Sequence, residues 1–232
     1  MIGVAVAAGL AGAAGLLTYG ALEPTNRLFG PVTSRGPRDR SVYLTFDDGP
    51  NEGATPAILD TLAEAGVPAT FFLVGRHVSR YPELTRRIAA AGHGIGNHTQ
   101  THAKLHRLGP HRIERELRSA HQAIVEASGT IPTMFRAPHG YRNPFVFRAA
   151  KALGYRVMGW SFGVWDTARP GAEEIRRRIL ARVGPGSILL LHDGDGYDPT
   201  GDRRQTAEAL PGIIADVRAR GYEFQPLAEI AT

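Results

Sequence analysis

The alternation of short apolar runs with amphipathic stretches limits most strongly what this chain can fold into. From Ser41 onward, stretches with apolar residues at helical spacing separate seven strand-like runs: SVYLTF, ATFFLV, HGIGNH, TMFRA, YRVMGWSF, SILLLH and YEFQPL. Several helical stretches end at a glycine just before the next run: Gly66, Gly92, Gly129, Gly154 and Gly221. Strands that alternate with helices predict an α/β fold with a mainly parallel sheet, either doubly wound and open or closed into a barrel.

Composition narrows the class of protein further. The 232 residues allow one sizeable domain, and the absence of cysteine excludes disulfides, thiolate metal ligands and cysteine nucleophiles. The net charge of +5 suits an anionic surface, but the arginines are scattered over predicted helix faces, which favours solvated faces over a nucleic-acid site. We therefore expect no nucleic-acid partner, and the composition leaves the oligomeric state open.

The N-terminus differs from the rest of the chain. Residues 1–22 carry no charged side chain, and about 20 apolar residues suffice to span a bilayer as a helix. The segment lacks the basic start and the small-residue cleavage site of a typical signal peptide, so we expect an uncleaved membrane anchor, with a cleaved signal as the alternative. Residues 23–40 are rich in Pro, Gly and Arg and are expected to form a linker or strap before one domain over residues 41–232.

Polar residues gather directly after the predicted strands. Asp47 and Asp48 follow VYLTF, and the later runs are followed by NHTQTH, RAPHG, WSFGVWD and HDGDG. In folds of alternating strands and helices, the carboxyl ends of the strands share one face, where barrel active sites lie. Neighbouring side chains on a strand point to opposite faces, so we expect the pleat to turn the two carboxylates in different directions.

Three of these polar residues form a candidate metal site. His98 and His102 are four residues apart, and on a helical turn this spacing places both imidazoles on one side; a pair of surface histidines is the alternative. Asp48, from another strand end, would complete a set of two nitrogen ligands and one oxygen ligand with an open position, as in catalytic Zn²⁺ sites. Ligand softness does not exclude Co²⁺, Ni²⁺ or Fe²⁺.

The motifs TFDDGP, HTQTH, RAPHG and LLLHDG, in this order, resemble the polysaccharide deacetylase family, the NodB-like carbohydrate esterases of family 4. The resemblance covers the chain from about Ser41 to its C-terminus. It implies a distorted (β/α) barrel of about seven parallel strands, one divalent metal, usually zinc, and removal of N-acetyl groups from amino sugars such as those of chitin or peptidoglycan.

The resemblance also implies a role for individual residues. Asp47 matches the general base, and Asp48, His98 and His102 match the metal ligands. Four further residues match the arginine that orients the base, the backbone N–H that stabilises the oxyanion, the general acid and a wall of the acetyl pocket: Arg136, His139, His192 and Leu190, respectively.

One segment, GWSFGVWDTARP, departs from the family pattern. The family commonly has an Asp-x-x-Asp-Trp arrangement here, but Gly163 stands where the first Asp is expected. Asp166 is therefore the candidate partner of His192, with Trp160 or Trp165 as the aromatic wall, and the alternative is that Asp166 only caps a turn. We expect the remaining candidates to lie on the surface, in helices or in a polar loop: His77, His106, His111, His121, Asp193, Asp195 and Asp198.

These features favour an N-deacetylase that acts on N-acetylglucosamine-containing glycans outside the cytoplasm. Two alternatives remain: a catalytically inactive homologue that binds glycans, and a deacylase or amidase of a small substrate. The presence of both Asp47 and His192 favours an enzyme, because binding alone needs neither a base nor an acid. The location conflicts with the positive-inside rule, which would keep a flank containing Arg27, Arg35, Arg38 and Arg40 in the cytoplasm.

Overall fold

The computed structural model describes residue 12 and residues 15–230. The described residues form one curled sheet, in which the strands run in the order β5-β4-β3-β2-β1-β7-β6 and β8 lies beside β1. All of these pairings are parallel. The strands are β1 (Ser41–Asp47), β2 (Thr70–Leu73), β3 (Gly94–Asn97), β4 (Met134–Phe135), β5 (Arg156–Val157), β6 (Phe162–Gly163), β7 (Ser187–His192) and β8 (Glu223–Phe224).

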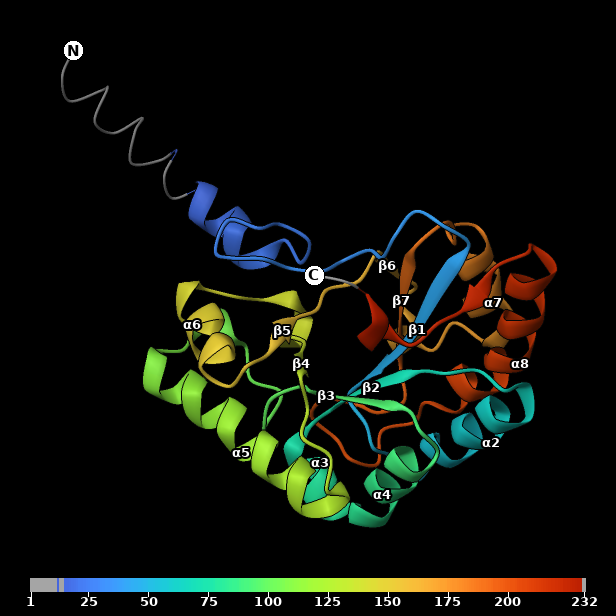
Figure 1. Cartoon of the computed structure of the whole chain (residues 1–232), viewed down its shortest axis with the longest axis horizontal. Helices are drawn as coiled ribbons and strands as arrows, with labels where there is room; N and C mark the ends of the chain where they lie inside the picture. The colour runs from blue at the N-terminus through green and yellow to red at the C-terminus, as the bar shows by residue number, and fades with distance from the viewer. Residues whose placement is uncertain (1–11, 13–14, 231–232) are drawn as a thin grey trace.

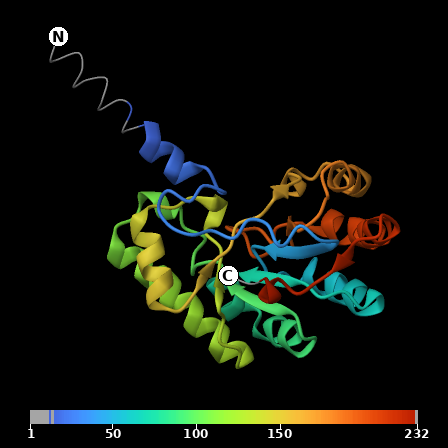
Figure 2. The ribbon, with the colours of Figure 1, turned by 45° about the horizontal axis from the view of Figure 1, so that its top comes forward.

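Helices cover the outside of this sheet (Figures 1 and 2). They are α2 (Thr55–Ala65), α3 (Gly75–Arg80), α4 (Pro82–Ala90), α5 (Pro110–Ser128), α6 (Pro144–Ala152), α7 (Ala172–Leu180) and α8 (Arg204–Ala219), with short 3₁₀ turns at Leu105–Arg107, Pro138–Gly140, Asp166–Ala168 and Leu227–Glu229. The glycines predicted to end helices all adopt a positive φ, between 60° and 76°. This conformation costs glycine little, which explains why the helices end there.

Strand β1 has a buried face on each side. Val42, Leu44 and Phe46 belong to the large apolar cluster between the sheet and its helices. The residues that alternate with them face the inside of the curl, where Tyr43 packs with apolar residues of other strands. Thr45 and Asp47 continue this inner face toward the carboxyl end of the strand. Asp47, the last inward-facing residue of β1, therefore lies at the open end of the barrel.

The run Tyr155–Phe162 was predicted as one strand, but it forms two. Strands β5 and β6 lie at opposite ends of the sheet order, and the residues between them cross the gap. Part of the strap (residues 23–40) pairs in this gap: Thr33 forms a parallel bridge with Met158, and Arg35 forms an antiparallel bridge with Ser187. Between β5 and β6, the Gly159 N–H donates to the Thr33 carbonyl of the strap, and the Ser161 N–H donates to the Ile188 carbonyl of β7. The prediction of a distorted (β/α) barrel is confirmed.

The N-terminal segment lies at the rim of the barrel beside α6 (Figures 1 and 2). Residues 15–22 are helical, and the Arg142 N–H donates a hydrogen bond of 3.0 Å to the Ala21 carbonyl. Within residues 15–230, the structure has no helix with both the length and the apolarity needed to cross a bilayer. Most of the predicted anchor, residues 1–11 and 13–14, lies outside the described residues.

Candidate active site

The predicted site residues meet in a cleft of about 590 Å³ at the carboxyl ends of the strands. The cleft is lined by Asp47, Asp48, His98, His102, His139, Trp160, Trp165, Leu190 and His192, among others. Arg136 and Asp166 are buried behind it. The predicted clustering of polar residues at the strand ends is thus present in the fold, and its members come from several different strand ends.

Asp47 and Asp48 reach the same part of the cleft, although the pleat predicted that they would diverge. Asp47 is the last residue of β1, and Asp48 leaves the strand with a φ of 74°. This left-handed turn redirects the second carboxylate, so that Asp47 Oδ2 and Asp48 Oδ1 lie 3.7 Å and 3.3 Å from the same atom, His98 Nε2. The expectation of pleat alternation was wrong because it assumed that the strand continues through Asp48.

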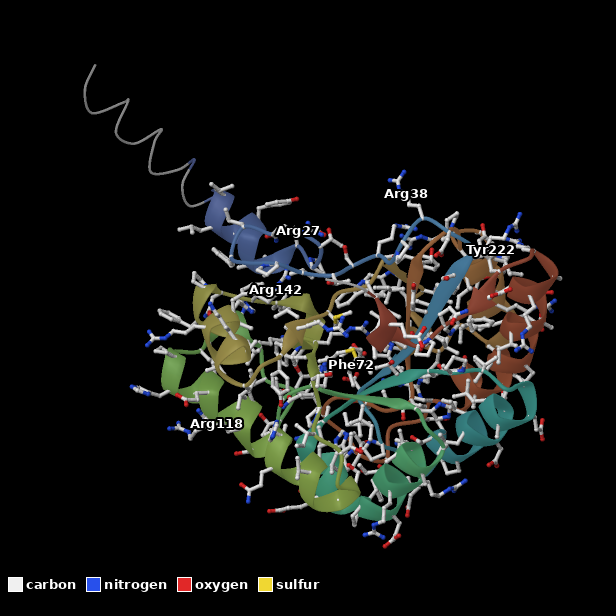
Figure 3. All side chains as sticks on the ribbon, in the orientation of Figure 1. Arg27, Arg38, Phe72, Arg118, Arg142 and Tyr222 are labelled. Carbon is white, nitrogen blue, oxygen red and sulfur yellow. The ribbon has the colours of Figure 1, made fainter. Side chains whose placement is uncertain are left out.

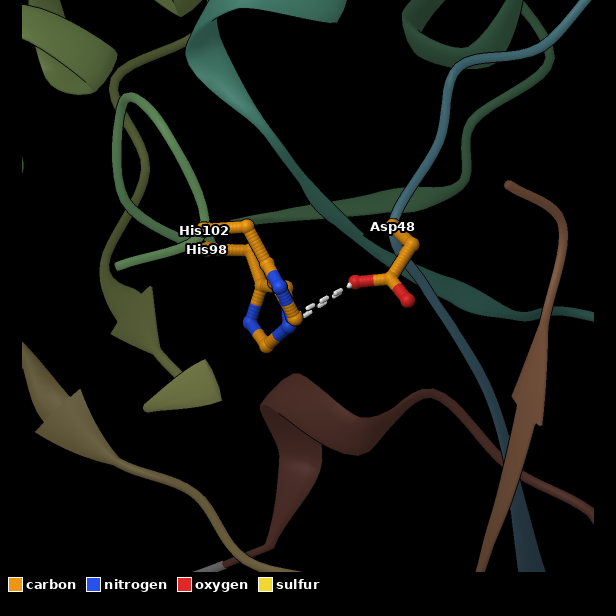
Figure 4. Close-up of side chains that lie close together, drawn as sticks. All are labelled: Asp48, His98 and His102. Atoms are coloured by element: carbon orange, nitrogen blue, oxygen red, sulfur yellow. Dashed lines mark ion pairs between the residues drawn. The ribbon is translucent and has the colours of Figure 1, made fainter. Parts of the chain in front are cut away.

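His98 and His102 face Asp48 together (Figure 4), but from a loop and not from a helical turn. His98 directly follows β3, and the loop reverses through Thr99 and His102, whose φ values are 68° and 58°. The two rings have centroids 5.1 Å apart. The predicted pairing of the imidazoles is therefore present, whereas the helical explanation of the spacing is wrong.

The Asp48, His98 and His102 cluster fits a divalent cation. Asp48 Oδ1 lies 3.0 Å from His102 Nε2, and one ligand atom from each residue lies within 4.8 Å of the others. The His98 Nδ1–H donates to the Arg136 carbonyl at 2.8 Å, which orients the ring with Nε2 toward Asp48. All three side chains are buried. Two imidazole nitrogens and one carboxylate oxygen are the donor set of several transition metals, including zinc.

The charge of this cluster favours an ionised carboxylate. Burial by itself would raise the pKa of Asp48, but His102 and His98 hold that pKa well below its usual range. Behind the cluster, the buried His77 donates Nδ1–H to the Asp48 carbonyl at 2.9 Å. Burial lowers the pKa of His77, so it stays neutral and supports the Asp48 turn without adding charge.

Arg136 holds Asp47 from the inside of the barrel. Its Nη1 donates to Asp47 Oδ1 at 2.6 Å and to Thr45 Oγ1 at 2.8 Å, and its Nη2 donates to the Gly159 carbonyl at 2.7 Å. The guanidinium is fully buried and lies over the Phe72 ring, 4.1 Å from its centroid. A fixed cation leaves Asp47 Oδ1 occupied and turns Oδ2 toward the cluster.

Asp166 pairs with His192 on the opposite side of the cleft. The His192 Nδ1 donates to Asp166 Oδ1 at 2.9 Å, and Oδ2 accepts from the His192 backbone N–H at 2.8 Å and from Thr206 Oγ1 at 3.0 Å. Burial by itself would lower the pKa of His192, but the charge of Asp166 and its hydrogen bond, helped by Asp48 and Asp47, raise it to about 9. Asp166 also begins a 3₁₀ turn, but its carboxylate is bonded to His192 and Thr206.

The predicted substrate-side residues form the walls of the cleft. Leu190 of β7 is 8% exposed, and Trp160 lies with its ring 5.7 Å from the Arg136 guanidinium carbon. Trp165 is 76% exposed at the rim. His139 turns with a φ of 57°, and burial lowers the pKa of its side chain to about 4, so that its ring is neutral.

Two residues in or near the cleft have positions that the sequence did not predict. Tyr197 was not singled out, yet its hydroxyl lies 3.0 Å from His139 Nε2 and its ring meets His102 edge-on. Asp193, predicted to lie in a polar loop, is fully buried against the Gly49 turn, where Thr55 Oγ1 donates to it at 2.6 Å. The sequence signal for Asp193 was its place directly after His192, because a strand end of this barrel is buried.

The other histidines considered in the sequence lie outside the cleft, and the prediction for one of them, His77, needs a correction. His77, expected on the surface or in a helix, lies in α3 but is buried behind Asp48. His111 is exposed in α5, whereas His121 of the same helix is partly covered and contacts the Tyr155 hydroxyl at 2.6 Å. His106 lies in a 3₁₀ turn. None of these three lines the cleft.

Comparisons with known proteins give one family. The family described as polysaccharide deacetylase matches residues 34–158. The chain is 42% identical over 205 residues to a chitooligosaccharide deacetylase of Rhizobium leguminosarum bv. trifolii, covering 86% of this chain and 95% of the relative. It is 36% identical over 212 residues to a peptidoglycan-N-acetylglucosamine deacetylase of Bacillus cereus, covering 90% of this chain and 95% of the relative.

The fold agrees with the sequence relatives. The crystal structure of the Bc1960 peptidoglycan N-acetylglucosamine deacetylase superposes with a TM-score of 0.79 at 30% identity, covering 86% of this chain and 92% of that one. The resemblance found in the motifs is confirmed, and the chain belongs to the polysaccharide deacetylase family.

Proposed function

We propose that this protein is a metal-dependent hydrolase that removes N-acetyl groups from N-acetylglucosamine-containing glycans, either chitooligosaccharides or peptidoglycan. One observation carries the proposal: a single cleft unites a carboxylate held by a buried arginine, an Asp-His-His cluster and a carboxylate–histidine pair. Relatives with both substrates in their names support the substrate class. Zinc suits the donor set best.

The residues divide the reaction between two sides of the cleft. Asp48, His98 and His102 would hold the cation, which when bound supplies Lewis acidity to the amide carbonyl and to the attacking water. Arg136 occupies Asp47 Oδ1, so Oδ2 is the oxygen that takes the proton of the attacking water.

On the other side, Asp166 occupies His192 Nδ1, so Nε2 is the nitrogen that gives its proton to the leaving amine. The backbone N–H of His139 stabilises the oxyanion, and Leu190 with Trp160 or Trp165 encloses the acetyl group and its sugar. A cleft built only to bind a glycan would need neither the base nor the charged acid. The buried Asp166–His192 pair therefore favours an enzyme over an inactive binding homologue.

Acetate release tests the proposed reaction. The purified protein is assayed on chitooligosaccharides, on peptidoglycan and on a small aryl acetamide, with and without a chelator and with Zn²⁺ or Co²⁺ added back. We expect release from at least one glycan, its loss on chelation and its recovery with metal. Release from the small amide alone would favour the small-substrate alternative, and glycan binding without any release would favour the inactive homologue.

Metal content tests the ligand set separately. Wild-type protein should contain close to one equivalent of divalent metal by elemental analysis, and His98→Ala should lose it while keeping its fold. His111→Ala is the matched control, because His111 is exposed on α5 and lies outside the cluster. Unchanged metal content in His98→Ala would refute the assignment of this ligand.

For the location, we propose that residues 1–22 tether the protein to the membrane with the barrel outside the cytoplasm. The arginines that follow residue 22 are a weaker argument against this orientation than the sequence alone suggested. Arg35 donates to the Pro185 carbonyl at 2.7 Å, and Arg40 donates to the Arg220 and Gly221 carbonyls at 3.2 Å each, so both belong to the barrel and not to a free flank. Protease added to intact cells should digest the barrel; protection until lysis would contradict the proposed orientation.

A further inference from the structure

The beginning of the strap contributes side chains to the cleft. Glu23, Pro24 and Thr25 line the same cleft as Asp47 and His192. The family match starts at residue 34, so this wall comes from a part of the chain that precedes the match. The wall also directly follows the helical residues 15–22.

Arg142 holds this wall against the barrel. Its side chain is 2% exposed, and Nη2 donates to the Glu23 carbonyl at 2.8 Å and to the Asn26 carbonyl at 3.3 Å. Figure 3 shows Arg142 directly beneath the N-terminal segment. Burial lowers the pKa of Arg142 only to about 10, so the guanidinium stays charged and keeps its hold at neutral pH. A buried cation with backbone acceptors gives the wall a fixed position.

The wall also contacts the catalytic side chains through Trp160. A Cβ atom at Gly140 would lie 2.5 Å from Pro24 Cβ and 2.9 Å from Trp160 Cη2, so Pro24 and Trp160 meet over a position that only glycine leaves open. Trp160 in turn lies over the Arg136 guanidinium, which holds Asp47. A series of neighbouring side chains therefore runs from Pro24 through Trp160 and Arg136 to Asp47.

The chemistry of the wall suits a sugar ring. Glu23 Oε1 accepts from the Thr25 N–H at 3.3 Å and from Thr25 Oγ1 at 2.8 Å, which orients the carboxylate. Within the described part of the chain, no hydrogen bond to Oε2 is formed. A free carboxylate oxygen accepts from a sugar hydroxyl or ammonium group, and the Pro24 and Trp160 rings offer apolar surface to the C–H face of a pyranose.

We propose that Glu23, Pro24 and Thr25 form a subsite for a sugar unit next to the one that is deacetylated, and that Arg142 is its positioning residue. The inference rests on the proposed function, because it assumes a glycan in the cleft. Its consequence is that substrates longer than one sugar gain affinity from a wall that small acetylated compounds do not reach.

The test compares a long and a short substrate in Glu23→Gln and Thr25→Val. Glutamine keeps one oxygen for the bonds to Thr25, but it replaces the free acceptor Oε2 with an NH2 donor and removes the charge. We expect KM for the N-acetylglucosamine tetramer to rise roughly threefold to tenfold, the range of one hydrogen bond partly open to water, with kcat unchanged. Hydrolysis of an aryl acetate, which lacks the sugar, should not change. Glu223→Gln is the matched control, because Glu223 is exposed and pairs with the opposite end of β1.

Arg142→Met tests the positioning role, with circular dichroism to check folding. A folded variant should show the same rise in tetramer KM and keep its rate on the aryl acetate. If it does not fold, the Glu23 and Thr25 variants still decide the proposal. Unchanged tetramer KM in both of those variants would overturn the subsite. If wild type releases no acetate from any glycan, the proposed function fails instead, and tetramer binding by calorimetry in wild type and Glu23→Gln tests the wall on its own.

Discussion

Two buried carboxylates in the cleft have similar geometry but different partners. Asp47 accepts from Arg136 at 2.6 Å, and Asp166 accepts from His192 at 2.9 Å. An arginine keeps its proton at any pH at which the protein is folded, whereas a histidine can release it near neutrality. The cation of the first pair therefore keeps its proton, whereas the second pair contains a proton that can be transferred.

In the proposed reaction, this difference gives the two sides of the cleft opposite tasks. The Asp47–Arg136 side can only accept a proton, through the free Oδ2. The His192 pKa of about 9, raised from 6.5, keeps His192 protonated at neutral pH. Stabilisation from this raised pKa is complete below about pH 6.5 and is lost as the pH rises through about 9. A cation at Asp48 would offset part of the negative charge, so the working pKa lies at or below that value.

The largest effect is expected when the base is removed. Asp47→Asn should keep the metal and lose roughly 10²- to 10⁴-fold in kcat, the usual contribution of a general base. Asp48→Asn should weaken metal binding first. Elemental analysis and acetate release on both variants make the comparison. Equal loss of metal in the two would show that the neighbouring carboxylates do not divide the work as proposed.

The second effect concerns the titrating pair and depends on pH. In Asp166→Asn the supporting charge is gone while burial remains, so the His192 pKa should fall to about 6.5 or below. At pH 8 the protonated fraction would drop from about nine tenths to about three hundredths, a loss of roughly 30-fold. The alkaline limb of log(kcat/KM) against pH should move toward acid, with the acidic limb nearly in place.

A matched control keeps the charge but not the geometry. Asp166→Glu retains the carboxylate on a longer stem, so its alkaline limb should stay closer to that of wild type even if the rate falls. A wild-type rate and an unshifted alkaline limb in Asp166→Asn would mean that the carboxylate only shapes the turn.

The third effect concerns the Asp47–Arg136 pair. Arg136→Lys keeps a cation but cannot reproduce the planar fork that reaches Asp47, Thr45 and the Gly159 carbonyl. Two lost hydrogen bonds in a buried site should lower kcat by about tenfold and stability by about 1–3 kcal/mol. The alkaline limb should move little, because lysine keeps a cation beside Asp47, whose charge helps to raise the His192 pKa. A large shift of the alkaline limb here would mean that the charge of Asp47 affects His192 more strongly than that of Asp166.

Much of this arrangement follows from the sequence. The strand and helix periodicities, the glycine helix ends and the polar strand ends predicted an α/β fold with a mainly parallel sheet and one active face. The resemblance carried by the motifs implied that the sheet forms a distorted barrel and which residues meet there. The parts that were missed depend on backbone turns at non-glycine residues. Asp48 and His102 have positive φ values, and both turns were wrongly explained by strand or helix geometry. Aspartate and histidine adopt this conformation more readily than most residues, but the preference is too weak to predict a particular turn.

Long-range packing explains the other differences. The run Tyr155–Phe162 has one continuous strand pattern, and only the curl of the sheet assigns its two ends to opposite edges. Asp193 is buried by a loop that crosses the carboxyl end of β1, and Tyr197 meets His139 across the cleft. These contacts join residues that are far apart in sequence, so a local pattern can place Asp193 at a strand end but cannot show which residues it meets.

The smallest effect on activity is expected when Thr206 is replaced. This substitution tests whether the charge of Asp166 alone sets the His192 pKa. Its hydroxyl is one of three donors to Asp166. The Thr206 hydroxyl bonds to Asp166 and not to His192, so we expect this bond to stabilise the carboxylate nearly equally whether His192 is charged or neutral. Thr206→Val should therefore move the alkaline limb by only about a few tenths of a pH unit, while losing about 1.5–3 kcal/mol of stability as a buried carboxylate loses a donor. Thr206→Ser, which keeps the hydroxyl, is the control for both measurements. A large shift of the alkaline limb in Thr206→Val would mean that Asp166 takes up the proton shared with His192 when the Thr206 donor is lost. The charge of Asp166 would then depend on the Thr206 hydroxyl as well as on His192.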